Sequence, residues 1–394
     1  MAVNARPNPR CKRIDAPLRP DQPPSMMLSC RWPERLPPMT GKTTQKELAL
    51  ISAITLGILL CLFGLLETAL AFWYPRSYSF TLPPSIVKGL RHYYSSYDRQ
   101  IIQYRPDYAQ YDKDLFYTLK PGEFRFTGRE FDAPFSVNHL GLRDDEESLH
   151  APEVIVLGDS YAMGWGVEQE RTFAERLAAK TGKKVLNTGI SSYGTAREMI
   201  LLRKLDLSKL NYLIIQYGAN DYDENKAFRE HNNVLPISSP EEYQRLCRQE
   251  TCRADYYWGK LTLRLFPSLL RHPIKASSWF QRLDPKEPSP EYGDEVDLFL
   301  NALAHSGVNL EGVHLLVFET NVFDHNDPVF IQALEQRYQA NPASLPAGIA
   351  SLSVIDFSRQ WDNGHDFFVL DDHLTEAGHE KIAQTLATLI QHKE

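Results

Sequence analysis

Two short blocks of the 394-residue chain bring together the side chains that acyl transfer from an ester requires. Ser160 lies in the stretch GDSY (158–161), and His373 lies in DDHL (371–374). A serine hydroxyl is a weak nucleophile until a neighbouring base removes its proton, and the base is in turn oriented by a carboxylate. The two blocks therefore predict a nucleophile, a general base and an orienting acid in one site.

Acyl transfer also needs hydrogen-bond donors for the negative charge that develops on the carbonyl oxygen. Three candidate donors are the backbone N–H of Ser160, the N–H of Gly189 in NTG (187–189), and the side-chain amide of Asn220 in GAND (218–221). A serine or aspartate in GDSY could instead serve only as a helix N-cap. The agreement of the four blocks favours the catalytic interpretation.

The blocks follow short apolar runs, which are separated by stretches of helical periodicity. Strands that are apolar on both faces and alternate with helices predict a parallel sheet covered on both sides. We therefore expect an α/β, flavodoxin-like three-layer fold with a five-stranded parallel sheet, and the blocks at its carboxyl edge. The predicted strands are 153–159, 184–189, 211–218, 313–320 and 352–358, and the predicted helices are 171–181, 195–206, 293–306, 328–339 and 376–391.

The order and spacing of the blocks resemble the SGNH, or GDSL-type, serine hydrolase superfamily. GDSY is similar to its first block, the glycine of NTG to its second, GAND to its third and DDHL to its last. The resemblance implies that Ser160 is the nucleophile, His373 the base, and Ser160, Gly189 and Asn220 the oxyanion hole. The stretch NHLGLRDDE (138–146) also looks like membrane-anchored bacterial members, which implies a periplasmic location.

One position departs from the family pattern. The triad aspartate usually stands three residues before the histidine, where this chain has Leu370. We expect that a turn shorter by one residue lets Asp371 orient the imidazole of His373. Asp372 is a weaker candidate, because adjacent residues of an extended turn point in different directions. A Ser–His dyad without a carboxylate is the competing interpretation.

These observations predict a serine esterase, or deacylase, that uses no cofactor and acts on acyl esters, with envelope glycans and lipids as candidate substrates. An O-acyltransferase to a cell-envelope polysaccharide and a non-catalytic binding domain are the alternatives. The sequence leaves open the natural substrate, the acyl chain, the choice between hydrolysis and transfer, and the oligomeric state.

A membrane anchor is predicted before the catalytic blocks. Residues 48–66 hold 19 consecutive residues without a charge, and apolar character resumes after Glu67. A helix of this length can cross a hydrocarbon core of about 30 Å. We expect a single transmembrane helix over 47–74, in contact with the membrane through 48–74, with Trp73 and Tyr74 in an interfacial aromatic belt. A cleaved signal peptide is the alternative, but the apolar run is long for one.

Charge is divided unevenly around this helix. The chain carries a net −7, but residues 1–46 hold nine Lys and Arg against three Asp and Glu, so this tail carries +6 and the remainder −13. The tail is rich in proline and is expected to be disordered and cytoplasmic, with residues 75–394 on the other side of the membrane. The acidic remainder argues against nucleic-acid binding. Translation could start at Met1 or Met39, which N-terminal mass spectrometry distinguishes.

The exported part divides into an accessory β-rich segment (75–152) and a hydrolase-like domain (153–394) with an insertion over 225–295. Within the insertion, 260–283 is basic and amphipathic, and is either a packed helical segment, a lid or a membrane contact. Cys247 and Cys252 are the only cysteine pair after the span, so we expect a disulfide between them. The acidic and histidine residues near His373 match no metal-ligand spacing, and no metal site is expected.

Overall fold

The computed structural model describes residues 44–218, 220–275, 293–320, 328–362 and 364–393. Most of the predicted tail (1–46) lies outside them, and so do residues 276–292 of the predicted insertion (225–295). Contacts divide the chain into two units, residues 1–56 and 57–394. The described part of the first unit holds the first turns of helix α1 (Gln45–Trp73), and the second unit holds the rest.

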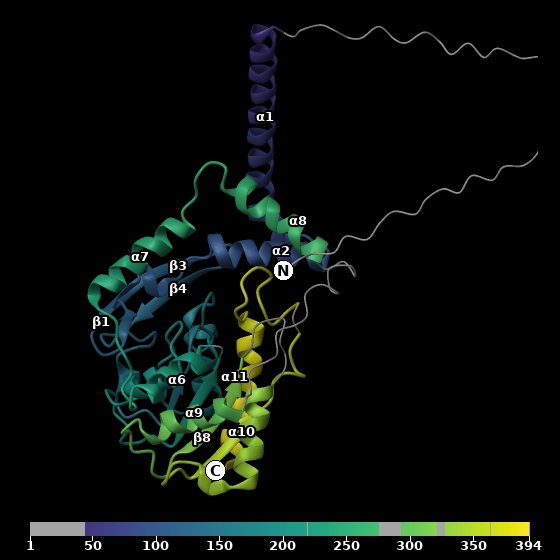
Figure 1. The fold of residues 1–394 in the computed structure, drawn as a ribbon. Coiled ribbons are helices and arrows are strands. Elements are labelled where there is room, and N and C mark those ends of the chain that lie inside the picture. Colours follow the sequence, from purple (N-terminus) through teal and green to yellow (C-terminus); the bar gives the residue numbers. More distant parts are fainter. Residues whose placement is uncertain (1–43, 219, 276–292, 321–327, 363, 394) are drawn as a thin grey trace, which may run out of the picture. The chain divides into compact units, whose positions relative to one another are not determined.

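The second unit is built on a five-stranded parallel sheet (Figure 1). Its strand order is β6-β5-β7-β8-β9, in which the second strand in sequence lies outside the first. This is the order of a flavodoxin-like doubly wound sheet. The predicted fold class is therefore confirmed. The strands are β5 (Val154–Leu157), β6 (Val185–Asn187), β7 (Tyr212–Tyr217), β8 (His314–Glu319) and β9 (Ser351–Ile355).

Alternate residues of β5 face opposite layers of helices, because successive side chains of a strand point to opposite faces. One buried cluster joins Val154 and Val156 to residues of α4 and α11, and another joins Ile155 and Leu157 to residues of α5, α9 and α10. The helices are α4 (Phe173–Thr181), α5 (Thr195–Leu202), α6 (Asp221–Glu230), α9 (Gly293–Ala304), α10 (Val329–Ala340) and α11 (Glu376–Lys393).

The segment before the sheet contains helix as well as strand. Two antiparallel hairpins pair β1 with β2 and β3 with β4, in agreement with part of the expected β-rich character. Helical turns precede them, starting where α1 ends. The elements are η1 (Tyr74–Ser79), α2 (Pro84–Tyr93), η2 (Tyr94–Asp98), η3 (Ile102–Tyr104), β1 (Ala109–Asp112), β2 (Phe116–Leu119), β3 (Gly122–Thr127), β4 (Asp132–Val137) and η4 (Glu147–Leu149).

The long connection between β7 and β8 is helical in its described part. After α6 it forms α7 (Pro240–Ala254), η6 (Leu261–Leu265) and α8 (Phe266–Lys275), and α8 packs against α2 of the preceding segment. The remaining short elements are α3 (Ser160–Met163), η5 (Gln169–Arg171) and η7 (Pro342–Ser344).

The loop that follows β6 lies directly against α3. A side chain at Gly189 would collide with the backbone nitrogen of Met163 and with the backbone of Ala162. Only glycine allows this approach, because a Cβ atom has no space between the two backbones. The close contact brings the ends of β5 and β6 together.

Replacing Gly189 by alanine is therefore expected to lower the free energy of unfolding by ~1–3 kcal/mol, the usual range for overpacking. Urea denaturation measures the change. Gly364→Ala is the matched control, because a Cβ at Gly364 meets only an ordinary contact with Asp362. Equal stability of the two variants would contradict the close approach.

Candidate active site

Ser160 lies at the start of the short helix α3, directly after strand β5. Gly158 has φ +153°, and a side chain there would collide with Gln216. Asp159 is the N-cap, and its carboxylate accepts the N–H of Tyr161 at 2.9 Å. The N-cap role suggested by the sequence thus belongs to Asp159. Ser160 occupies the first position of the helix, where backbone N–H groups have no partner within the helix.

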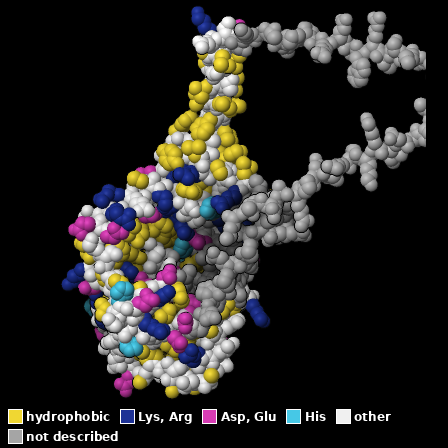
Figure 2. All heavy atoms as spheres, viewed as in Figure 1, with side chains coloured by type: hydrophobic (Ala, Val, Ile, Leu, Met, Phe, Trp, Pro, Cys, Tyr) yellow, Lys and Arg dark blue, Asp and Glu magenta, His cyan; other side chains and the backbone are white. Residues whose placement is uncertain are grey.

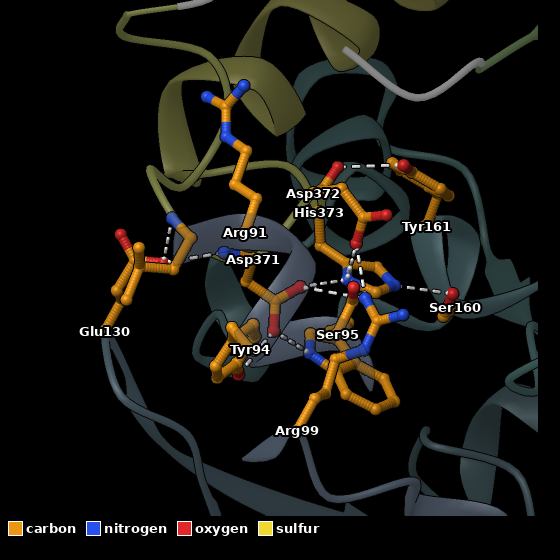
Figure 3. Close-up of polar contacts among 12 residues, drawn as sticks. Arg91, Tyr94, Ser95, Arg99, Glu130, Ser160, Tyr161, Asp371, Asp372 and His373 are labelled. Carbon is orange, nitrogen blue, oxygen red and sulfur yellow. Dashed lines mark hydrogen bonds and ion pairs between the residues drawn. The ribbon is translucent and has the colours of Figure 1, made fainter. Parts of the chain in front are cut away.

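The imidazole of His373 lies between Ser160 and Asp371 (Figure 3). Its Nε2 is 2.7 Å from Ser160 Oγ, and its Nδ1 is 2.5 Å from Asp371 Oδ1. The indole of Trp165 stacks on the imidazole with 4.6 Å between ring centroids and an interplanar angle of 11°. The hydrogen bonds and the stacking together fix the imidazole in one orientation.

The carboxylate of Asp371 is fully buried and accepts hydrogen bonds from several elements. Besides His373, it accepts the Tyr94 hydroxyl at 2.7 Å and the Trp165 indole N–H at 3.2 Å, and Arg99 Nη1 lies 3.7 Å away. Burial alone would raise the pKa of Asp371, but His373, Arg99 and Tyr94 together hold it well below its ordinary value. The group is therefore a carboxylate at neutral pH, able to stabilise a protonated imidazole.

Asp372 has a different environment from Asp371. Its Oδ1 pairs with Arg99 Nη1 at 2.5 Å and is 3.5 Å from His373 Nδ1. Its backbone carbonyl accepts the hydroxyl of Tyr161 at 2.8 Å. Of the two aspartates that the sequence left open, the structure places Asp371 in the hydrogen bond with the imidazole.

The loop that carries Asp371 is attached to the preceding segment by Glu130. The Glu130 carboxylate accepts the backbone N–H groups of Val369, Leu370 and Asp371 at 2.7, 2.7 and 2.8 Å. Arg91 of α2 donates to the carbonyl oxygen of Val369 at 2.7 Å. Burial raises the pKa of Glu130 to about 6, so the carboxylate form that accepts these bonds predominates above that pH.

Of the three predicted oxyanion donors, Ser160 is the first residue of α3, and Gly189 and Asn220 lie beside this helix and have acceptors in the protein. Gly189 N–H donates to Asn187 Oδ1 at 3.0 Å, and the Asn220 amide donates to Asp159 Oδ2 at 2.7 Å. An amide NH₂ group carries two hydrogens, so Asn220 retains one for a ligand. The bond to Asp159 also holds the amide beside the N-cap of α3.

Tyr94, Arg99, Glu130 and Trp165 were not identified from the sequence. The first three lie in the 75–152 segment, more than 230 residues before the loop they contact, and belong to no short motif. Trp165 lies between Gly164 and Gly166, shortly after GDSY. These two glycines were a local signal that other chain segments approach the backbone closely near Ser160.

Asp371, Asp372 and His373 also offer ligand-type atoms within 4.8 Å of one another. Their charge is balanced by protein groups, since Arg99 lies beside both carboxylates and Asp371 binds the imidazole. This is the arrangement of an ion-pair network around a histidine.

A surface cavity of about 670 Å³ is lined by Glu130, Gly166 and His365 but by neither Ser160 nor His373.

The predicted disulfide between Cys247 and Cys252 is wrong, because both thiols are free. Both residues lie on α7, where Cys247 is buried and Cys252 is exposed. Five residues along a helix correspond to a rise of roughly 7.5 Å, which is beyond the reach of a disulfide. The sequence spacing suggested a loop, whereas the segment is helical.

The GDSL-like Lipase/Acylhydrolase family matches residues 156–381, which include Ser160, Asp371 and His373. The chain belongs to this family. The blocks GDSY (158–161) and DDHL (371–374) both fall inside the matched region, as the resemblance implied. No curated protein matches the chain.

Solved structures similar to this family member share little sequence with it. A candidate GDSL-like lipase from Bacteroides ovatus has a TM-score of 0.31 and 11% identity, over 61% of this chain and 53% of its own. A candidate lipolytic protein of the G-D-S-L family from Desulfitobacterium hafniense has a TM-score of 0.29 and 12% identity, over 60% and 97%. A carbohydrate esterase family 2 enzyme with a carbohydrate-binding domain comes from Corynascus thermopiles (Myceliophthora fergusii). It has a TM-score of 0.30 and 12% identity, over 60% of this chain and 64% of its own. This chain thus covers about half of the Bacteroides protein.

In this GDSL family member, replacing Glu130 by glutamine is expected to lower kcat for a chromogenic ester about tenfold, or ~1.4 kcal/mol. The amide offers an NH₂ group where the carboxylate accepts N–H groups, so the loop of Asp371 loses part of its attachment. KM should change little. Steady-state kinetics measure both constants.

The matched control is Glu123→Gln, since Glu123 is an exposed residue of β3. Equal kcat values for the two variants would show that the three bonds to Glu130 do not position the loop.

Proposed function

We propose that the chain is a membrane-anchored serine esterase that cleaves acyl esters through an acyl-enzyme. The observation that carries this proposal is the continuous hydrogen-bonded series from Ser160 Oγ through His373 to the Asp371 carboxylate. Membership of the GDSL-like family supports the reaction class. A nucleophile, a base and an orienting acid in this order match the arrangement of serine hydrolases on unrelated folds.

In the first half of the reaction, His373 Nε2 accepts the proton of Ser160 as Oγ attacks the ester carbonyl carbon. The carbonyl oxygen becomes an oxyanion, for which the Ser160 N–H and the free amide hydrogen of Asn220 are the proposed donors. The protonated imidazole then gives its proton to the leaving alcohol. Asp371 stays ionised throughout and stabilises the imidazolium through Nδ1–H.

In the second half, water attacks the acyl group on Ser160, and His373 takes the proton of that water. The tetrahedral intermediate collapses, the acid leaves, and the proton returns to Ser160. Transfer to a sugar hydroxyl would follow the same path with the hydroxyl in place of water, so both reactions share one acyl-enzyme.

The proposed anchor is α1. One helical stretch in the described residues, Gln45–Ser79, is long and apolar enough to cross a membrane. The +6 charge of residues 1–46 supports a cytoplasmic N-terminus by the positive-inside rule. We therefore propose that 75–394 is extracytoplasmic, periplasmic in a bacterium with two membranes, with 75–152 as an accessory segment to a hydrolase domain over 153–394.

The catalytic proposal predicts different effects for the two neighbouring aspartates. Asp371→Asn should lower kcat/KM for a chromogenic ester by ~10²–10⁴-fold, because the imidazole loses its ionic partner. Asp372→Asn should stay within about tenfold of the wild type, because Asp372 pairs with Arg99 and is farther from the imidazole. A larger loss in Asp372→Asn than in Asp371→Asn would reverse the assignment.

A fluorophosphonate probe tests the nucleophile in the same preparations. It should label the wild type and not Ser160→Ala, and His373→Ala should label far more slowly. Wild-type protein that takes no label would favour the binding-domain alternative. Acylated glycan formed from an acyl donor and a glycan acceptor would assign the chain to transfer instead of hydrolysis.

The topology proposal is tested with Cys252, which is exposed on α7. In spheroplasts treated first with a membrane-impermeant reductant, a membrane-impermeant maleimide should label the wild type but label Cys252→Ser much less. Cys11 and Cys30 of the tail should react only after lysis. Labelling of Cys252 that requires lysis would place the catalytic domain in the cytoplasm.

A further inference from the structure

Helix α1 contains one acidic residue between Leu48 and Trp73, and that residue is Glu67. Its side chain is buried, and its carboxylate accepts the backbone N–H groups of Leu261 and Thr262 at 3.3 and 2.7 Å. It also accepts the hydroxyl of Tyr256 at 2.9 Å. These N–H groups belong to the first turn of η6, where an acceptor is otherwise missing. Glu67 therefore attaches the segment 256–271 to the second half of α1.

Packing holds the same segment against α1 on its inner side. The rings of Phe63 and Trp258 lie 5.0 Å apart, and a side chain at Gly259 (φ +92°) would press on the Phe63 ring. Leu261 and Leu265 are buried in one cluster with Leu70 of α1 and with residues of α2. The inner side of the segment is therefore fixed.

The segment also exposes apolar side chains to solvent. Six large side chains of it are between 37% and 63% exposed, and we call them the interfacial surface: Tyr256, Tyr257, Trp258, Leu263, Phe266 and Leu270. Arg264 and Arg271 are exposed among them, and the sequence has no acidic residue over 256–271. Aromatic, aliphatic and arginine side chains without acids are the composition that suits the headgroup region of a bilayer.

The interfacial surface continues the exposed apolar surface of α1. Leu65 and Phe72 of α1 are also exposed, and Figure 2 shows hydrophobic side chains covering this helix. The predicted belt at Trp73 and Tyr74 is wrong for Tyr74, which is buried and donates its hydroxyl to Asp98 at 3.0 Å. Tyr74 therefore faces protein, and Trp258 contacts α1 about 15 Å before Trp73 along the helix axis.

The length of α1 agrees with a membrane boundary near Phe63 and Glu67. The 23 residues from Gln45 to Glu67 span roughly 34 Å as a helix, close to the ~30 Å of a hydrocarbon core. A boundary at this level places the interfacial surface at the headgroups.

We propose that the interfacial surface lies in the headgroup region of the phospholipid bilayer that α1 crosses, as a second membrane contact beside the anchor. This inference rests on the proposed anchoring. Arg264 and Arg271 would attract anionic headgroups, and the apolar side chains would enter the acyl boundary.

The same contact orients the active site. Leu370, which precedes Asp371, is buried in the cluster that holds Leu261 and Leu265. Gly89 of α2 lies against the backbone of Ser268 in α8. The segment 256–271 and the loop that carries His373 thus share one packed core. This core holds the active site at a fixed orientation to the bilayer. An acyl ester at the membrane surface is the substrate class that such an orientation favours.

Tryptophan quenching in vesicles tests the contact. The full chain is reconstituted in 3:1 phosphatidylcholine and phosphatidylglycerol, with and without acyl chains brominated close to the headgroup. The emission that Trp258→Phe removes should fall by about half in brominated vesicles, since bound interfacial helices lie within ~5–10 Å of the headgroup boundary. Trp361→Phe is the matched control, because half-buried Trp361 packs against Phe357 and Phe367 of the hydrolase domain. The emission that it removes should not be quenched.

The outcomes separate the inference from the proposals beneath it. Unquenched Trp258 emission in vesicles from which carbonate does not extract the protein overturns the interfacial contact and leaves the anchor intact. Extraction by carbonate overturns the anchor and the contact together. Fluorophosphonate labelling of Ser160 in the same vesicles reports the proposed catalysis separately and shows that Trp258→Phe is folded.

Discussion

The burial of the Asp371 charge is the constraint on which the rest of the site depends. A carboxylate without solvent is costly unless hydrogen bonds and opposite charge compensate it. Here the compensation comes from the His373 imidazole, the Tyr94 hydroxyl, the Trp165 indole and the nearby Arg99 guanidinium. Two of these groups lie outside the hydrolase-like fold, in the segment that precedes it. The segment is therefore part of the active site, and the geometry of the catalytic loop depends on its packing.

This dependence gives a reason for the departure from the family pattern at Leu370. The position that usually carries the acid is here a buried apolar residue, packed with the end of α1 and with α2 and η6. Asp371, one residue later, is directed at the imidazole, while Glu130 and Arg91 bind the backbone of the turn. A turn so attached orients its acid from a different position, because backbone hydrogen bonds define its course. The acid and its supporting contacts make one unit.

The fold and the blocks of the site were predictable, whereas the contacts between distant segments were not. Strands such as 154–157 are continuous apolar runs next to glycine, so local composition and alternation were enough to place Ser160 at a strand end. Glu130 and Glu67 are ordinary acids in the sequence, and only folding shows that each caps a set of backbone N–H groups. The predicted disulfide between Cys247 and Cys252 was wrong because their spacing suits a disulfide loop, whereas the segment is a helix. Tyr74 misled because its aromatic ring suits an interface and the residue is buried.

The central claim is that the imidazole of His373 donates its Nδ1–H to the carboxylate of Asp371. Proton NMR of the chain in detergent micelles observes such a proton directly, far downfield of the amide region. We expect a downfield resonance in the wild type and in Asp372→Asn, and its loss in Asp371→Asn and in His373→Ala. A resonance that persists in Asp371→Asn but disappears in Asp372→Asn would contradict the account and assign the orienting role to the other carboxylate.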